Sequence, residues 1–552
     1  MSSHTGSAAP GLVLRTGVPD TAAYDEAVAG AVAEGLASRI ASHDADLWGP
    51  EAAEEAGKRL GWTGLATASR PLVADIEALH AELATQGVHR VVLCGMGGSS
   101  LAPEVICEAA GVPLDVVDSS DPDFVRRAAG ERLSETVVVV SSKSGGTVET
   151  DSQKRAFEAA FRDAGIDPAG RIVVVTDPGS PLEESATQDG YRVFRADPEV
   201  GGRFSALTAF GLVPSGLAGA DIGGLLDEAE AARPDLEADS ADNPGTRLGV
   251  LMGRAAVDGV DKLVLADAGS AYPGLGDWIE QLVAESTGKD GTGILPVVVE
   301  HLDAPDFGRQ ATPDSVLTAI GPRTTFLDGL EPPSGYTVAV DGPLGAQLLL
   351  WEYATAVAGR ILGINPFDQP DVESAKAAAR EMLDGAGEPP RLRFSSGAVS
   401  VFADGASGGD WLPDGTDSVP DAVSALLDRL DPEQGYLSVQ VYADRHRDAG
   451  LARLRPALAV RTGRPTTFGW GPRFLHSTGQ YHKGGPATGV YLQVTTEPEA
   501  DLEVPGRPFT FAEFLTAQAV GDGRVLAGKG RPVLRLHVAS PEHLDALVRE
   551  LV

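Results

Sequence analysis

Cysteine is nearly absent from this chain, since only Cys94 and Cys107 occur among 552 residues. Two cysteines cannot build a disulfide framework or a cysteine-based zinc site. Long apolar runs are missing as well, and no stretch of 18 apolar residues could span a membrane. The first residues contain neither a basic segment nor an apolar one, so we expect no signal peptide. These absences predict a cytoplasmic protein.

Positive charge is also scarce. The chain has 44 Lys and Arg against 79 Asp and Glu, which gives a formal net charge of −35 at pH 7. Nucleic acids and anionic membranes are bound through clustered Lys and Arg, so we expect neither as a partner. An anionic small molecule is still compatible with this charge, provided that the chain builds a local positive site for it.

Short β-rich runs and helical patterns alternate from residue 88 onward. Five of the runs lie at 90–95, 114–119, 136–142, 171–177 and 191–197. Runs that are apolar on both faces and alternate with helices are typical of a parallel sheet covered on each side. The sequence therefore predicts an α/β fold with doubly wound, mainly parallel sheets.

We predict three parts of the chain. Residues 1–87 carry helical patterns and form an N-terminal helical segment. Residues 88–222 form a first doubly wound α/β domain, and residues 223–552 form a second one. An insertion around 383–434 is rich in Gly, Asp, Ser and Pro, which predicts a loop with a short β-hairpin. A C-terminal extension completes the second domain.

A turn rich in Ser, Gly and Thr follows the third of these runs and leads into a helix. Its hydroxyl residues are Ser142, Ser144 and Thr147, and Lys143 lies among them. Ligands of doubly wound sheets sit beyond the carboxyl ends of the strands, and exposed N–H groups at a helix start attract anions. The turn is therefore a candidate phosphate site. A tight turn with capping hydroxyls is the alternative.

A second turn of the same form follows the strand at 90–95. Gly98 and Ser99 stand at the start of its helix. The turn, GMGGSS, lacks the third glycine of the dinucleotide fingerprint, and no ribose-binding acid is clear about 20 residues further on. Two hydroxyl-rich turns in one sheet point to a compact phosphate monoester rather than to a dinucleotide.

Two later segments carry residues suited to charge stabilisation and proton transfer. Arg203 follows two glycines, so it could reach into a cleft and stabilise negative charge, or form an ordinary surface ion pair. Gln281 and Glu285 are four residues apart and share one face of a helix. Glu285 could serve as a general base, although an exposed glutamate is the commoner outcome in so acidic a chain.

Two more segments lie nearer the C-terminus. Gln369 and Lys376 are seven residues apart, so on one helix with Pro370 in its first turn they would face the same way. Lys376 could equally be a solvated helix lysine. His476 precedes a Gly turn and could exchange protons near neutral pH, or be a hydrogen-bonded core histidine. His482, in the same segment, is the alternative candidate for this proton exchange.

Together these segments resemble the glucose-6-phosphate isomerase family, whose members contain SIS (sugar isomerase) domains. The turns GMGGSS and SSKSGGT resemble the phosphosugar-binding turns of a SIS domain. The blocks VGGRFS, QLVAESTGKDG, NPFDQPDVESAK and FLHSTGQYHKGG resemble signatures of the family, and the matching segments are spread over residues 91 to 485. The resemblance implies two SIS-type domains, a phosphosugar substrate and the interconversion of glucose 6-phosphate and fructose 6-phosphate through a cis-enediol.

The resemblance also assigns roles to individual residues. Glu285 matches the base that transfers the proton, and Arg203 matches the residue that stabilises the enediolate. His476 and Lys376 match the groups that open the sugar ring. The substrate- and phosphate-binding residues that it implies are Gln281, Gln369, Gly98, Ser99, Ser142, Lys143, Ser144 and Thr147. We expect no metal or organic cofactor, because a carbonyl already acidifies the C2 proton and no cluster of residues has metal-ligand spacing.

Two features depart from the family pattern. In common bacterial members the histidine block precedes the FDQP helix, whereas here His476 follows Gln369 and Lys376. The second turn has Gly146 where the family has a hydroxyl residue. Because the family is typically dimeric, with the histidine crossing from the partner subunit, a homodimer is one expectation. The altered order would also allow the chain to supply the histidine itself.

Two other functions are compatible with these residues. The enediol loses the stereochemistry of C2, so a dual phosphoglucose/phosphomannose isomerase is one alternative. A phosphosugar-binding SIS protein without catalytic activity is another. A binding protein needs the phosphate turn but not the base, so the joint presence of Glu285, Arg203, Lys376 and His476 favours an enzyme.

Overall fold

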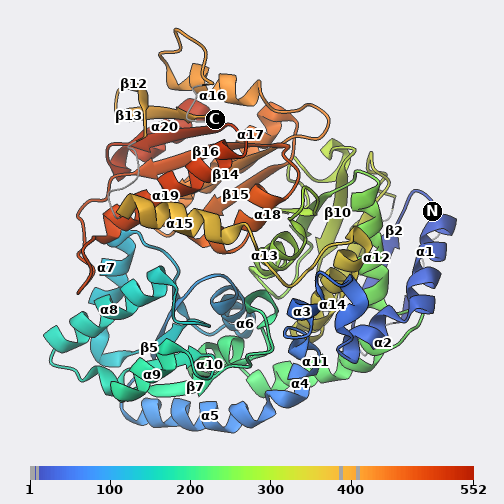
Figure 1. Ribbon diagram of the computed structural model, residues 1–552, viewed down its shortest axis with the longest axis horizontal. Helices are drawn as coiled ribbons and strands as arrows, with labels where there is room; N and C mark the ends of the chain where they lie inside the picture. The colour runs from blue at the N-terminus through green and yellow to red at the C-terminus, as the bar shows by residue number, and fades with distance from the viewer. Residues whose placement is uncertain (1–5, 8–10, 328, 384–389, 406–410) are drawn as a thin grey trace.

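The computed structural model describes residues 6–7, 11–327, 329–383, 390–405 and 411–552. Three mainly parallel β-sheets with flanking helices make up this part of the chain (Figure 1), so the predicted α/β class is confirmed. Most of the first ten residues, in which we expect no signal peptide, lie outside the described residues. So do residues 384–389 and 406–410 of the predicted insertion.

The first sheet has the strand order β4-β3-β5-β6-β7 and is parallel throughout. Counted along the chain this order is 2-1-3-4-5, so the winding reverses between β3 and β5. Ligands of doubly wound sheets bind at such a switch point, and the two predicted phosphate turns follow these two strands. The strands are β3 (Arg90–Gly95), β4 (Asp115–Val117), β5 (Thr136–Ser141), β6 (Ile172–Thr176) and β7 (Arg192–Arg195). The helices of this part are α6 (Leu101–Ala110), α7 (Pro122–Gly130), α8 (Val148–Asp163), α9 (Pro181–Gln188) and α10 (Ala209–Ala218).

The second sheet has the order β1-β2-β11-β10-β8-β9. Its four later strands are parallel and repeat the 2-1-3-4 winding, β2 pairs antiparallel with β11, and β1 pairs antiparallel with β2 at the edge. The strands are β1 (Gly6–Ser7), β2 (Val13–Gly17), β8 (Lys262–Asp267), β9 (Leu295–Val299), β10 (Ser315–Ile320) and β11 (Thr337–Asp341). The helices of this part are α11 (Ile222–Glu237), α12 (Pro244–Val257), α13 (Leu275–Thr287) and α14 (Leu344–Leu362).

The third sheet has the order β12-β13-β17-β16-β14-β15. Four parallel strands again wind 2-1-3-4, and the antiparallel hairpin β12–β13 extends the sheet beside β17. This is the hairpin predicted within 383–434. The strands are β12 (Leu392–Ser396), β13 (Val399–Asp404), β14 (Tyr436–Tyr442), β15 (Thr466–Trp470), β16 (Gly489–Thr496) and β17 (Val533–Val538). The helices are α15 (Val372–Leu383), α16 (Val419–Leu427), α17 (Leu454–Thr462), α18 (Gly479–Gly484), α19 (Phe511–Gly528) and α20 (Leu544–Leu551).

The N-terminal part is helical, as the sequence predicts, but it also supplies β2 to the second sheet. Its helices are α1 (Thr21–Glu34), α2 (Leu36–Ala41), α3 (Ala53–Ala56), α4 (Leu65–Ala68) and α5 (Arg70–Thr85). Residues 223–552, expected to form one domain, carry most of the second sheet and all of the third. The division into domains stays a prediction. Among the described residues, no helix is both long and apolar enough to cross a membrane.

The three sheets meet near the centre of the molecule, where α13, α15 and α18 lie close together (Figure 1). Helix α13 follows β8 of the second sheet, whereas α18 follows β15 of the third. The short helical turn Arg473–His476 directly precedes α18. This arrangement brings segments that are distant in the sequence, such as the turn after β3 and the turn before α18, to one region of the fold.

Candidate functional site

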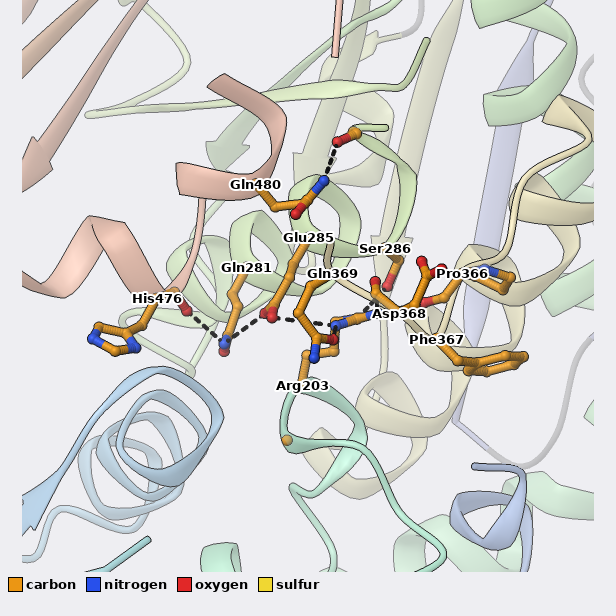
Figure 2. Close-up of polar contacts among 12 residues, drawn as sticks. Arg203, Gln281, Glu285, Ser286, Pro366, Phe367, Asp368, Gln369, His476 and Gln480 are labelled. Atoms are coloured by element: carbon orange, nitrogen blue, oxygen red, sulfur yellow. Dashed lines mark hydrogen bonds and ion pairs between the residues drawn. The ribbon is translucent and has the colours of Figure 1, made fainter. Parts of the chain in front are cut away.

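Arg203 is the centre of a dense polar network. It lies in the helical turn Gly202–Phe204 and is only 3% exposed. Its Nε donates to Oγ of Ser286 at 2.8 Å, and its Nη1 donates to Oε1 of Gln369 at 2.9 Å. Its Nη2 donates to the carbonyl oxygens of Pro366 and Asp368 at 2.7 and 2.9 Å (Figure 2). The guanidinium is therefore held from two sides, by α13 and by the segment before α15.

Glu285 faces this guanidinium from α13. Its Oε1 lies 3.2 Å from Nη1 of Arg203, and its Oε2 accepts a hydrogen bond of 3.1 Å from Nε2 of Gln281. Gln281 and Glu285 thus share one face of the helix, as their spacing predicts. Burial lowers the pKa of Arg203, and the charges of Glu285 and Asp368 oppose this effect. The partly buried carboxylate and the buried cation form an ion pair at the edge of the site.

Lys289 stabilises the loop whose carbonyl oxygens accept hydrogen bonds from Arg203. Its Nζ donates to the carbonyl oxygens of Asn365 and Asp368, each at 2.6 Å, and to Oδ1 of Asp368 at 2.7 Å. Burial and the neighbouring Arg203 lower the pKa of Lys289 to about 8, against the attraction of Asp368. The sequence alone does not identify Lys289 or Ser286 as site residues, although both lie in the segment QLVAESTGKDG.

Gln369 and Lys376 do not share a helix, which corrects the prediction. The helix α15 begins at Val372, and Gln369 directly precedes Pro370, a position that is disfavoured in the helical region. Gln369 therefore lies in the preceding segment and contacts Arg203. Lys376 stands on α15, where its Nζ pairs with Glu373 at 2.8 Å.

His476 connects the Arg203 network to the first sheet. Its carbonyl oxygen accepts a hydrogen bond of 2.8 Å from Nε2 of Gln281, while its ring points away from Gln281 (Figure 2). The ring Nε2 lies 2.9 Å from Oε1 of Glu149, in the first turn of α8. The same oxygen of Glu149 accepts a hydrogen bond of 2.7 Å from Gln518 of α19. His476 therefore reaches this position from the same chain.

Glu149 is a functional candidate that sequence reasoning does not identify. Burial alone would raise the pKa of its carboxyl, but the adjacent His476 ring holds it below the ordinary value. A glutamate in the first turn of a helix looks like a partner of the helix dipole, so the sequence offers no reason to select it. Its position two residues after Thr147 is the one available signal.

His482, the rival histidine, lies in the interior. Its Nδ1 is 2.9 Å from Oη of Tyr436, and its Nε2 is 3.3 Å from Oγ of Ser438, both on β14. Burial and the nearby Lys483 and Arg531 hold the pKa of His482 well below its ordinary value. The geometry is that of a hydrogen-bonded core histidine.

The turn after β5 is held together by hydrogen bonds among its own residues. Backbone N–H groups of Gly145 and Gly146 donate to the hydroxyls of Ser142 and Ser144 at 3.2 Å each. Thr147 stands at the N-cap of the 16-residue helix α8, and its side chain makes no capping hydrogen bond. Its hydroxyl accepts from Ser142 at 3.3 Å.

Lys143 belongs to this turn but is directed elsewhere. Its Nζ lies 2.6 Å from Oδ2 of Asp177, which follows β6. Burial lowers the pKa of Lys143, and the paired Asp177 opposes this. The ammonium group of Lys143 therefore points toward Asp177 and not toward the hydroxyls of the turn.

The turn after β3 packs tightly under the Arg203 network. A Cβ on Gly98 would lie 2.0 Å from the carbonyl oxygen of Gly202, next to Arg203. Gly97 has a φ of +56°, and a Cβ there would lie 2.6 Å from the carbonyl oxygen of His476. Ser99 ends this short helical turn before α6 begins. Close backbone approach explains why this turn needs glycine.

One pocket joins the end of the predicted phosphate turn to the residues predicted to open the sugar ring. It lies between the start of α8, α15, α19 and the turn that carries His476. Its lining residues are Gly146, Thr147, Val148, Glu149, Val372, Lys376, Ala379, Arg380, Leu383, Leu475, His476, Phe514 and Gln518. We call it the site pocket. Arg203, Glu285, Gln281 and Gln369 form the adjoining network, and Gln281 links the two through the backbone of His476.

No model of a known protein family matches the chain, but individual proteins do. It is 31% identical over 379 residues to a probable glucose-6-phosphate isomerase of Haloarcula marismortui, a match that covers 60% of this chain and 86% of the relative. It is 30% identical over 405 residues to the protein of the same name from Natronomonas pharaonis, with coverages of 65% and 93%.

Two solved structures share the fold. A hypothetical protein from Thermus thermophilus matches with a TM-score of 0.57 and 25% identity, covering 67% of this chain and 99% of the other. A glucose-6-phosphate isomerase from Chlamydia trachomatis matches with a TM-score of 0.55 and 20% identity, covering 69% and 90%.

Proposed function

The chain belongs to the glucose-6-phosphate isomerase family, and on this premise we propose that it interconverts glucose 6-phosphate and fructose 6-phosphate. The observation that carries the proposal is the ion pair between buried Arg203 and partly buried Glu285, 3.2 Å apart beside the site pocket. A fixed cation next to a carboxylate base is the arrangement that proton transfer through an enediolate requires.

Substrate phosphate binds at the turn after β5. Its hydroxyls belong to Ser142, Ser144 and Thr147, and the start of α8 adds N–H groups and the positive end of the helix dipole. The ammonium group of Lys143 is paired with Asp177, so it supplies positive charge near the phosphate without contacting it directly. Gly98 and Ser99 of the neighbouring turn bring backbone close to the substrate. These groups form a local anion-binding site in a chain whose formal net charge is −35.

Ring opening is assigned to His476 with Lys376, since both line the site pocket. In this step a proton leaves the O1 hydroxyl of the cyclic sugar and a proton reaches the ring oxygen, so the bond from C1 to that oxygen breaks and C1 becomes an aldehyde. Glu149 accepts a hydrogen bond from the His476 ring and fixes its orientation, which leaves the second ring nitrogen for the sugar.

Isomerisation is assigned to Glu285. Its carboxylate takes the proton from C2, the electron pair forms the C1–C2 double bond, and the aldehyde oxygen becomes an enediolate oxygen beside Arg203. The proton of the C2 hydroxyl then passes to the C1 oxygen, the electron pair of the double bond takes the proton back from Glu285 at C1, and the C2 oxygen becomes the ketone. Gln281 and Gln369 hold substrate hydroxyls. Oε1 of Gln281 has no hydrogen-bond partner among the described residues, so it is available to accept one from the substrate.

A coupled assay of the purified protein tests this function directly. We expect rapid formation of glucose 6-phosphate from fructose 6-phosphate and little turnover of mannose 6-phosphate. Comparable turnover of both aldose phosphates would identify a dual phosphoglucose/phosphomannose isomerase. Binding of fructose 6-phosphate without turnover would identify a non-catalytic phosphosugar-binding protein. Because the proposed substrates are metabolites of central carbon metabolism, in glycolysis and gluconeogenesis, we also propose a cytoplasmic location.

A further inference from the structure

A second pocket lies on the opposite side of α19 from the site pocket. It has a volume of about 170 Å³ and is bounded by α19, the hairpin strand β13 and the ends of β14, β16 and β17. Its lining residues are Pro390, Phe402, Tyr442, Thr495, Thr496, Glu497, Leu515, Thr516, Ala519, Val520, Arg535 and His537. We call it the Arg535 pocket. A single buried water needs only about 10–15 Å³, so there is room for a small ligand.

Arg535 is a buried cation whose two terminal nitrogens have no hydrogen-bond partner among the described residues. It is 3% exposed, and within the described part of the chain neither Nη1 nor Nη2 makes a hydrogen bond. Its guanidinium carbon lies 4.6 Å from the centre of the Phe402 ring. Burial lowers the pKa of Arg535, although Asp404 and Tyr442 act in the opposite direction. An aromatic face compensates a guanidinium only in part, and an unpaired buried charge is strongly destabilising.

Tyr442 adds a second unused donor to the same pocket. Its side chain is fully buried, and Oη has no hydrogen-bond partner among the described residues. Burial keeps the pKa of Tyr442 well above its ordinary value, so the hydroxyl stays protonated and can donate. Arg535 and Tyr442 together offer N–H and O–H donors, and the guanidinium has no acceptor of its own that a ligand would have to satisfy. The group that satisfies them is an oxyanion.

The other charged groups that line the pocket already have partners. His537 pairs with Glu497 through Nε2 at 3.2 Å, and its Nδ1 lies 3.0 Å from Oγ1 of Thr495. Outside the lining, Asp522 pairs with Lys483 at 2.6 Å. Arg524 is a further cation near Arg535. Glu497 and Asp522 are therefore engaged with other residues. The charge of Asp404 also acts on Arg535, but neither Nη1 nor Nη2 makes a hydrogen bond within the described residues.

We propose that the Arg535 pocket binds the oxyanion group of a small metabolite, a phosphate or a carboxylate, through Arg535 and Tyr442. The site is independent of the proposed isomerase chemistry, since none of its lining residues belongs to the site pocket. The two pockets share one wall. Phe514 and Gln518 of α19 face the site pocket, whereas Leu515 and Ala519 of the same helix face the Arg535 pocket. Helix α19 therefore separates an anion bound there from Gln518 and its partner Glu149.

Isothermal titration calorimetry on the full chain tests the proposal. The double variant Ser144→Ala/Thr147→Ala serves as background, because it removes hydroxyls of the predicted phosphate turn. Inorganic phosphate and acetate are titrated separately, as probes of the two ligand classes. We expect at least one of them to bind this background, and Arg535→Met to weaken that binding about tenfold or more, because a charged hydrogen-bonded contact is lost. Binding of phosphate alone, acetate alone or both identifies the class.

Two further variants keep the result interpretable. Arg461→Met removes an exposed arginine of α17, whose Nη2 donates to Oγ of Ser424 at 2.7 Å, and should leave binding unchanged. Tyr442→Phe removes one donor that has no partner among the described residues, so it should fold normally and weaken the same binding several-fold. The proposal is overturned if neither probe binds the background protein. It is equally overturned if binding persists unchanged in Tyr442→Phe and in folded Arg535→Met.

Discussion

Nε2 of His476 lies 2.9 Å from Oε1 of Glu149, although 327 residues separate them. The glutamate comes from the helix after β5 of the first sheet, and the histidine comes from the turn after β15 of the third. The pair therefore assembles only when both sheets are folded and packed. It also places the imidazole on the pocket that holds the phosphate turn.

Replacing Glu285 with glutamine should nearly abolish isomerisation. Gln keeps the shape and the contact with Gln281 but cannot take a proton, so the rate should fall by about 10²–10⁴. Exchange of the C2 hydrogen with D₂O, followed by NMR, should fall in parallel. Glu54→Gln, at a mostly exposed glutamate of α3, is the matched control. Near-normal exchange in Glu285→Gln would show that another group is the base.

Loss of the His476 ring should affect cyclic substrates selectively. His476 is assigned only to ring opening, so His476→Ala should slow fructose 6-phosphate turnover far more than turnover of a shorter sugar phosphate that cannot cyclise. Steady-state kinetics with both substrates measure the difference. His89→Ala, at an exposed histidine before β3, is the control. Equal slowing of both substrates would assign His476 another role.

The hydroxyls of the turn after β5 should contribute to substrate affinity. A hydrogen bond to a charged group is worth about 1.5–3 kcal/mol, so Ser144→Ala or Thr147→Ala should raise KM for fructose 6-phosphate roughly tenfold or more. Thr187→Ala on the exposed part of α9 removes a comparable hydroxyl from the same sheet region and should have no effect. An unchanged KM in both turn variants would place the phosphate elsewhere.

Each chain should carry a complete site. Because His476 reaches the pocket in the same chain as Glu285, refolding a mixture of Glu285→Gln and His476→Ala chains should restore no activity. If the histidine instead came from a partner subunit of a homodimer, random pairing would restore about a quarter of the wild-type activity. The recovered activity after co-refolding, compared with each variant refolded alone, distinguishes these arrangements.

Activity should not depend on a divalent metal ion. The proposed steps use only carboxylate, imidazole, ammonium and guanidinium groups, so prolonged treatment with EDTA followed by gel filtration should leave the rate of fructose 6-phosphate turnover unchanged. Addition of Mg²⁺, Mn²⁺ or Zn²⁺ to the treated protein should give no increase. A loss of activity that one of these ions restores would contradict the mechanism.

The sequence predicts the strands of the first sheet well, because long apolar runs such as the one in β5 are buried on both faces. It does not predict β2 or β10. The first is five residues long with a charged centre, and the second, SVLTAI, alternates polar and apolar residues too weakly to stand out. Both strands are fixed by neighbours in the second sheet, β11 and β8, which are distant in sequence.

A candidate site residue can be predicted from the sequence where its residue type implies a chemical role. It cannot be predicted where its role depends on tertiary contacts. Arg203, Glu285, Gln281 and Gln369 are brought into one network, as the resemblance implies. The sequence does not reveal Glu149 or Lys289, because their importance depends on contacts with His476 and with the loop around Asp368. The direction of Lys143 toward Asp177 depends likewise on the neighbouring strand β6.

The contact between Gly98 and Gly202 sets a limit on how this protein can vary. Even the smallest side chain at position 98 would lie 2.0 Å from the Gly202 carbonyl oxygen, and it would push away the turn that carries Arg203. In a saturation library selected for growth, position 98 should therefore accept glycine alone. Gly64, where an added Cβ would meet nothing within 4 Å, should accept many residues. Variants of this protein can then change at many surface positions, but not at position 98, where two backbone segments are in direct contact.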